Sequence, residues 1–184
     1  MALVESRGRA AGDVLPEATL HDPDGRPVEV ASLAGPKGLL VAITCNHCPY
    51  AQAVWPRLID LAEHAKGLGI ATVAVNPNLN PAYPDDSPRE MKAEIARRGI
   101  AFPYLADMDQ SFARALSAAC TPEFFLYDAG RRLAYHGRLD DDWKDASRVT
   151  RHELRDAIEA LASGQPIATD PRPSMGCSIK WVED

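Results

Sequence analysis

Residues 38–50 read GLLVAITCNHCPY, an apolar run that leads directly into two cysteines three positions apart. A continuous apolar run of this length is typical of a central strand that is buried on both faces of a sheet. From Pro49 the apolar residues change to helical spacing, so a strand over 38–44 is expected to pass through the cysteines into a helix. This junction decides both the fold and the chemistry that the sequence predicts.

The segment after the cysteines has one apolar face. Its apolar residues follow one another at spacings of four, three, four and three positions: Val54, Leu58, Leu61, Ala65 and Leu68. This spacing predicts a helix over 49–68, and Pro56 is expected to kink it because proline lacks a backbone donor. The run IATVAVN over 70–76 then predicts a second buried strand.

The rest of the chain continues to alternate between strand and helix patterns. Two capping boxes, SPRE at 87–90 and TRHE at 150–153, predict helices over 88–98 and from 150 to about 162. The other predicted elements are a β-hairpin over 18–30, a strand over 102–107, a small helix over 109–118 and a hairpin formed by 124–128 and 132–137. Such alternation predicts an α/β fold with a central mixed β-sheet flanked by helices.

The length and composition are those of one globular domain. The chain has 184 residues, of which 46% are apolar and 25% charged, which is enough to build a core. We expect the domain to cover residues 14–164. A flexible N-terminus (1–13) is expected before it, and an extended, proline-rich C-terminal tail (165–184) after it.

Charge and hydropathy argue against several classes of partner. The net charge of −6 and the scattered basic residues argue against nucleic-acid binding. No apolar run approaches the roughly 18 residues that cross a bilayer, so no membrane partner is expected. The first residues, MALVESRGRAAGDV, lack the apolar core of a secretory signal, and we therefore expect a cytoplasmic protein.

The motif CNHC at 45–48 is the main candidate for chemistry. At a strand-to-helix junction, the unpaired N–H groups of the first helical turn and the helix dipole would stabilise a thiolate on Cys45. A protonated His47 would add a positive charge. Cys45 would then attack a substrate disulfide, and Cys48, one helical turn further, would resolve the mixed disulfide.

Two other uses of the motif stay open. A C-x-x-C pair is also half of many zinc sites, although the chain has no second C-x-x-C and no H-x-x-x-H to complete four ligands. Cys45, His47 and Cys48, with or without Cys177, would still suit Cu(I) or Zn²⁺ in a binding module without turnover. The thiols could also be inert and structural. The strand-to-helix context favours redox exchange over both.

At these residues the chain resembles the thioredoxin superfamily. The stretch around CNHC, the strand ending VNPN and the segment CTPEFFLYD (120–128) are similar to thioredoxin-like members of the redoxin and thiol-specific-antioxidant branch. The resemblance implies a thioredoxin-like fold in which Thr121 and a cis-Pro122 lie opposite the cysteine pair and hold an extended peptide or thiol against it.

The same resemblance implies a thiol–disulfide oxidoreductase that requires no bound cofactor. Its substrate would be a disulfide-bearing protein or a small thiol, and a reductase or the glutathione system would exchange electrons with it. Asn46 and His47 stand where reductant thioredoxins have Gly-Pro, and a histidine before the second cysteine resembles disulfide oxidases and isomerases. Asn46, His47 and Pro49, which directly follows the pair, are expected to support the two cysteines. Whether the protein reduces or oxidises its substrate stays open. The peroxiredoxin motif P-x-x-x-T-x-x-C is absent. A thiol peroxidase is therefore an alternative and not the main expectation.

Two cysteines lie outside the motif. Cys120 precedes the expected cis-proline closely, so it should lie near the Cys45–Cys48 pair, and Cys177 lies in a tail that could fold back. One hypothesis is that Cys120 and Cys177 form an accessory dithiol that exchanges electrons with the pair. The alternative is that Cys120 is a small buried apolar residue and that neither takes part in catalysis.

Overall fold

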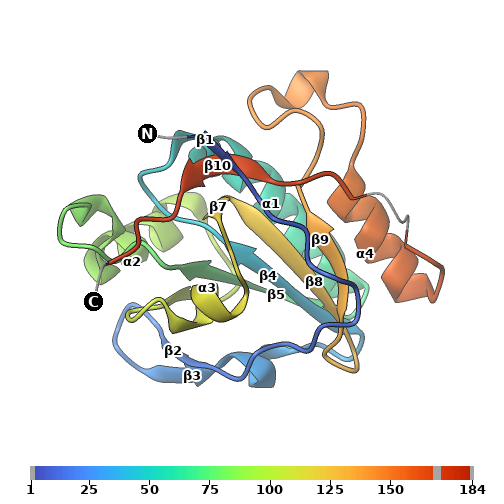
Figure 1. Ribbon diagram of the computed structural model, residues 1–184, viewed down its shortest axis with the longest axis horizontal. Coiled ribbons are helices and arrows are strands. Elements are labelled where there is room, and N and C mark those ends of the chain that lie inside the picture. Colours follow the sequence, from blue (N-terminus) through green and yellow to red (C-terminus); the bar gives the residue numbers. More distant parts are fainter. Residues whose placement is uncertain (1–2, 168–170, 183–184) are drawn as a thin grey trace.

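The computed structural model describes residues 3–167 and 171–182. Within these ranges the main sheet contains β2 (Thr19–His21), β3 (Pro27–Glu29), β4 (Gly38–Ile43), β5 (Ile70–Asn76), β6 (Tyr104–Ala106), β8 (Glu123–Asp128) and β9 (Leu133–Gly137). Their order across the sheet is β3-β2-β6-β5-β4-β8-β9 (Figure 1). β4, β5 and β6 are parallel and the other pairs are antiparallel, so the sheet is mixed, as predicted.

Helices cover both faces of this sheet. In the described part of the chain the α-helices are α1 (Pro49–Gly67), α2 (Pro88–Arg98), α3 (Ser111–Ala115) and α4 (Glu153–Ser163). Short 3₁₀ helices are η1 (Val30–Leu33), η2 (Pro84–Asp86) and η3 (Ala146–Arg148). α1 continues through Pro56. None of the described helices combines the length and the apolar character needed to cross a membrane.

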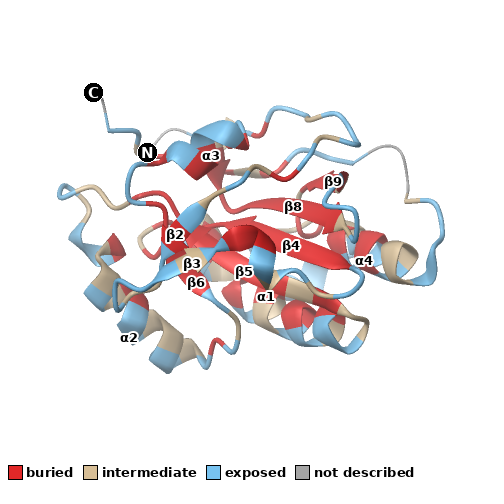
Figure 2. Ribbon diagram, turned by 90° about the horizontal axis from the view of Figure 1, so that it is seen from below, coloured by how far each residue is buried: buried red, intermediate tan, exposed pale blue. Residues whose placement is uncertain are grey.

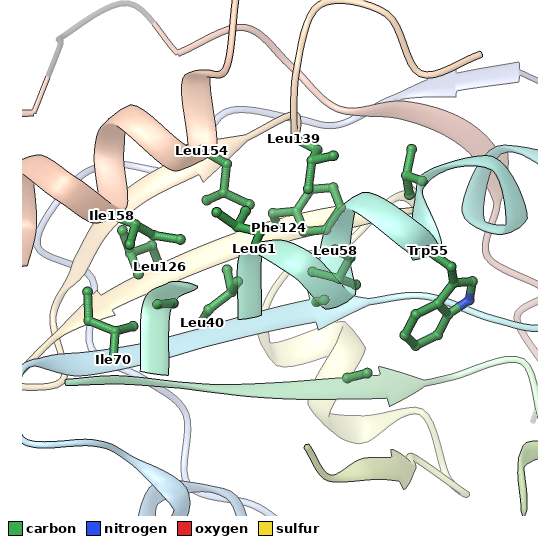
Figure 3. Close-up of a cluster of buried hydrophobic side chains, with 14 of the residues drawn as sticks. Leu40, Trp55, Leu58, Leu61, Ile70, Phe124, Leu126, Leu139, Leu154 and Ile158 are labelled. Carbon is green, nitrogen blue, oxygen red and sulfur yellow. The ribbon is translucent and has the colours of Figure 1, made fainter. Parts of the chain in front are cut away.

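The side chains of the central strand alternate between two halves of the core. Leu40 and Ala42 of β4 pack in one cluster with residues of α1 and α4, and Figure 3 shows Leu40 among them. Leu39, Val41 and Ile43 pack in a second cluster, on the side of α3 and η1. Successive residues of a strand point to opposite faces, which is why the run needs no polar residue. Figure 2 shows the strands as a buried layer between the helices.

A second, smaller sheet lies at the end of the molecule where β4 leads into α1. It consists of β1 (Leu3–Glu5), β10 (Met175–Ser178) and β7 (Cys120–Thr121), with β10 in the middle and antiparallel to both neighbours. Figure 1 shows β1 and β10 side by side. Residues 3–5, expected to belong to a flexible N-terminus, therefore form a strand, and so does part of the C-terminal tail. Both segments are ordered because β10 hydrogen-bonds on its two edges.

Two predictions about helix ends are wrong. α3 is shorter than predicted because Gln110 and Ser117 adopt left-handed backbone conformations, with φ of 60° and 55°. The capping box at Thr150 does not form, since its N–H and its hydroxyl donate to the Asp141 carboxylate at 2.8 and 2.5 Å. α4 begins at Glu153 instead.

Candidate active site

Cys45 and Cys48 lie between the end of β4 and the beginning of α1. Pro49 is the first residue of the helix, and Cys48 is its N-cap residue. Both cysteine side chains are fully buried, at 0% exposure. A strand from the middle of the sheet and a helix with a buried face therefore fix the position of the pair.

The segment predicted to lie opposite the pair contacts both sulfur atoms. The Thr121–Pro122 peptide bond is cis, as the family resemblance implies. Cys45 Sγ lies 3.4 Å from Thr121 Oγ1, and Cys48 Sγ lies 3.1 Å from the Thr121 carbonyl oxygen, which accepts a hydrogen bond from the Cys48 thiol. Thr121 thus touches both cysteines with two different groups.

Cys177 completes a cluster of three thiols. It is 1% exposed and packs with Cys45 and Cys48. The register of the small sheet sets this position, because Cys177 pairs with Thr121. The tail therefore lies directly over the cysteine pair.

Cys120 lies on the other face of the same small sheet, so it does not face Cys177 in this structure, and the Cys120–Cys177 dithiol stays a prediction. Cys120 pairs with Ser178, one position away from the Cys177–Thr121 pair, and neighbouring positions of a strand face opposite sides. Its sulfur instead lies 3.8 Å from a carboxylate oxygen of Glu123. Burial, and then the nearby Glu123 charge, raise the pKa of Cys120 well above that of a free thiol.

The site favours a thiolate on Cys48, whereas the sequence predicts one on Cys45. Burial raises the pKa of Cys45, and so do its hydrogen bond to Cys48 and the charge of Asp86. The hydrogen bond from the Cys45 thiol lowers the pKa of Cys48 to about 4, against burial, with further hydrogen bonds from Cys177 and the Ala51 amide. The helix begins at Pro49 rather than at Cys45, and its free amides therefore favour a thiolate on Cys48.

A buried carboxylate supports the loop between the two cysteines. Asp86, in η2, is fully buried, and its Oδ1 accepts hydrogen bonds from the Asn46 amide at 2.6 Å and from Asn76 Nδ2 at 3.0 Å. Its Oδ2 pairs with His47 Nδ1. The His47 ring also stacks on Tyr83, with 4.7 Å between ring centroids. One carboxylate thus fixes both residues that separate the cysteines.

The sequence analysis does not find Asp86, because it lies in the proline-rich segment NPNLNPAYPDD (76–86), where no motif marks it. Its place could have been found from topology: β4 and β5 are parallel neighbours, so the loops at their carboxyl ends meet at one edge of the sheet. Asn46, an expected supporting residue, is held by two side-chain hydrogen bonds. Its side chain accepts a hydrogen bond from the Tyr104 hydroxyl at 2.9 Å and donates one to the Asp85 carbonyl at 2.8 Å.

Three of these side chains could also hold a metal ion. One ligand atom each of Cys45, His47 and Asp86 lies within 4.8 Å of the others. In addition, His47 Nε2 is buried without a hydrogen-bond partner among the described residues. Thiolate and imidazole suit Zn²⁺ or copper, whereas a fully protein-bound structural zinc would need a fourth ligand.

The ionisation of Cys48 can be measured in the reduced protein. Absorbance of thiolate at 240 nm should persist at neutral pH and disappear only in acidic solution, as the pH falls through the lowered pKa of Cys48. Cys48→Ser should remove this signal, and Cys120→Ser should leave it unchanged. A titration with its midpoint near the free-thiol value of about 8.5 would contradict the assignment.

The chain is similar to a family and to several solved structures. A family model described as Redoxin matches residues 10–158. A hypothetical protein from Sinorhizobium meliloti 1021 is 38% identical, covering 98% of this chain and 99% of its own, with a TM-score of 0.92. An uncharacterized conserved protein from Geobacillus kaustophilus is 36% identical, covering 100% and 98%, with a TM-score of 0.94.

A more distant likeness concerns the fold alone. A thiol:disulfide interchange protein of the thioredoxin family from Chlorobium tepidum TLS is 19% identical, covering 70% of this chain and 87% of its own, with a TM-score of 0.56. No curated protein sequence matches the chain significantly.

Proposed function

Since the chain belongs to the redoxin family, we propose that it is a thiol–disulfide oxidoreductase that works through a Cys45–Cys48 redox pair. Family membership supports a thiol redox function. The observation that carries the finer proposal is the buried packing of Cys45 against Cys48, beside a cis-proline segment that contacts both sulfur atoms. Two cysteines packed together in this way are placed to form a disulfide.

The proposed reaction begins with Cys45. Its proton passes along the hydrogen bond to Cys48, and the Cys45 thiolate attacks a disulfide R–S–S–R′. An S–S bond forms between Cys45 and R, and R′ leaves as a thiolate. A raised pKa makes the Cys45 thiolate a strong nucleophile but makes it rare, so attack by Cys45 depends on transfer of its proton to Cys48.

Cys48 completes the exchange. Its proton passes to a leaving thiolate, its sulfur attacks the sulfur of Cys45, and the second substrate thiolate leaves. The protein then holds a Cys45–Cys48 disulfide, and the substrate has gained two electrons. A dithiol reductase or glutathione would restore the reduced pair by the reverse exchange.

In this proposal His47 and Asp86 position the reacting thiol. Asp86 holds the Asn46 amide and the His47 ring, so the turn that carries Cys45 is fixed from a neighbouring loop. The negative charge of Asp86 also favours the protonated form of Cys45. The pair is thereby kept as one thiol and one thiolate until a substrate arrives.

The substrate is proposed to be an extended segment of a disulfide-bearing protein, or a small disulfide. A groove that reaches the cis-proline has Pro122, Trp143 and Met175 among its lining residues, together with the charged Arg138 and Asp140. Trp143 packs on Tyr50, the second residue of α1, with ring centroids 4.1 Å apart. This surface offers both apolar and polar contacts to a peptide.

The test is equilibration of the protein in graded glutathione redox buffers, followed by alkylation and mass-spectrometric mapping of the four cysteines. A Cys45–Cys48 disulfide should form and disappear reversibly. A potential near about −270 mV would identify a reductant, and one above about −180 mV an oxidant. A pair that stays reduced across the whole range would overturn the proposal.

A metal-binding module is the second candidate, because Cys45, His47 and Asp86 present ligand atoms within 4.8 Å of one another. This reading expects stoichiometric Zn²⁺ or copper in the purified protein and its loss in Asp86→Ala. Metal-free protein that exchanges disulfides readily would decide against it.

A further inference from the structure

The C-terminal strand occupies the edge of β7 that the family resemblance assigns to an extended substrate. β10 runs antiparallel to β7, with Cys177 opposite Thr121, the residue before the cis-proline. Gly176 makes this approach possible, since a Cβ on it would lie 2.0 Å from the Thr121 carbonyl oxygen. The strand therefore places its own cysteine at the pair, as a bound disulfide substrate would.

This position is held from both sides of Cys177. On its N-terminal side, the Ser174 amide donates to Ser6 Oγ at 2.9 Å. On its C-terminal side, the Lys180 amide donates to Asn78 Oδ1 at 2.8 Å, and the Lys180 carbonyl oxygen accepts from Gln110 Nε2 at 2.9 Å. Contacts on both sides of Cys177 fix the register of β10, so Cys177 is held against Cys48.

We propose that Cys177 is a third redox-active cysteine, which forms a disulfide with Cys48 by exchange with the Cys45–Cys48 disulfide. This inference rests on the proposed function, which supplies that disulfide. The contact that carries it is the packing of Cys177 against Cys45 and Cys48 in a buried cluster of three thiols, in the register that places Cys177 opposite Thr121.

The exchange is balanced without an external oxidant. The sulfur of Cys177 attacks the sulfur of Cys48, the Cys45–Cys48 bond breaks, and a Cys48–Cys177 bond forms. Cys45 leaves as a thiolate and takes up the proton that Cys177 gives off. No electrons are gained or lost overall: the disulfide moves to the C-terminal strand, and Cys45 is again a thiol.

Cys120 provides an internal control on the same pair of strands. It is as buried as Cys177 and one position from Thr121, but it faces the other side of the small sheet. If burial close to the pair were sufficient, Cys120 would form disulfides with Cys48 as readily as Cys177 does. The proposal expects that it does not.

The first experiment uses Cys45→Ser, treated with oxidised glutathione and mapped by mass spectrometry after acid quenching. Cys48 should form a mixed disulfide with glutathione, and Cys177 should displace the glutathione, so that the Cys48–Cys177 disulfide exceeds the glutathione adduct at least tenfold. The Cys45→Ser, Cys177→Ser double variant should keep the adduct. A lasting adduct in Cys45→Ser, or a Cys48–Cys120 disulfide of similar abundance, would overturn the proposal.

The second experiment leaves all three cysteines in place. Gly176→Ala should exclude β10 from β7 and reduce the Cys48–Cys177 disulfide at least tenfold, while the Cys45–Cys48 disulfide still forms. Gly67→Ala is the matched control, because no atom lies within 4 Å of a Cβ at that position. A Cys48–Cys177 yield in Gly176→Ala equal to that of the control would contradict the inference.

The two proposals fail in different ways. Wild-type protein that forms Cys45–Cys48 but never Cys48–Cys177 would reject the third cysteine and leave the proposed function standing. Protein that forms Cys48–Cys177 directly, with no Cys45–Cys48 disulfide at any redox potential, would reject the proposed pair.

Discussion

In a Cys177→Ser background, replacement of Cys45 by serine should lower disulfide turnover by at least about a thousandfold, because the hydroxyl is not a nucleophile for sulfur at neutral pH and Cys48 has no second thiol to complete the exchange. Cys48→Ser should lower it to a similar extent for a different reason. That variant can begin the exchange but lacks the thiol that resolves it. Reduction of a peptide disulfide with dithiothreitol as the electron source would measure both losses.

The two variants should be distinguishable by their products. Cys48→Ser should accumulate a covalent adduct between Cys45 and the substrate, visible as a mass increase, whereas Cys45→Ser should form no adduct at position 45. Cys120→Ser is the matched control and should retain wild-type turnover, since its sulfur contacts Glu123 rather than the pair. An adduct on Cys48 of the wild-type protein, with none on Cys45, would reverse the assigned roles.

Replacement of Asp86 by alanine should lower the free energy of unfolding by about 3–5 kcal/mol, because it removes one partner of a buried charged contact. The change leaves the Asn46 amide, Asn76 Nδ2 and His47 Nδ1 without their shared acceptor. It should also lower the pKa of Cys45, since the Asp86 charge raises it. Urea denaturation and a thiolate titration would measure the two effects.

Asp85→Ala is the matched control for Asp86. Asp85 is exposed and supports the site only through its backbone carbonyl, which the substitution keeps. It should therefore leave both the unfolding free energy and the thiolate titration within error of wild type. Equal stability losses in the two variants would mean that the buried carboxylate does not hold the turn.

Much of the fold can be predicted from the sequence because its apolar residues follow the patterns of fully buried strands and one-sided helices. β4 and β5 are apolar throughout, and α1 and α2 carry start signals and a single apolar face. The small sheet could not be predicted in this way. Its strands are two to four residues long, and β1 and β10 come from opposite ends of the chain, so no local periodicity marks them.

The site was predictable where its residues are close in sequence. Cys45 and Cys48 share one motif, and the family resemblance supplied Thr121 and Pro122. Asp86 could not be predicted, because a single aspartate in a proline-rich loop forms no sequence pattern. Its role follows only from the groups that it contacts in the fold. The pairing of Cys177 with Thr121 could not be predicted either, because a one-residue shift in strand register turns a side chain to the opposite face.

The strand that covers the cysteines also sets how often they can be reached. Alkylation of Cys45 requires a transient opening, so its rate relative to an unprotected thiol reports the population of open molecules. Each tenfold slowing corresponds to about 1.4 kcal/mol of opening free energy. A substrate that binds only open molecules has its apparent affinity reduced by that same fraction, so variants that loosen the strand should bind more tightly without gaining a contact.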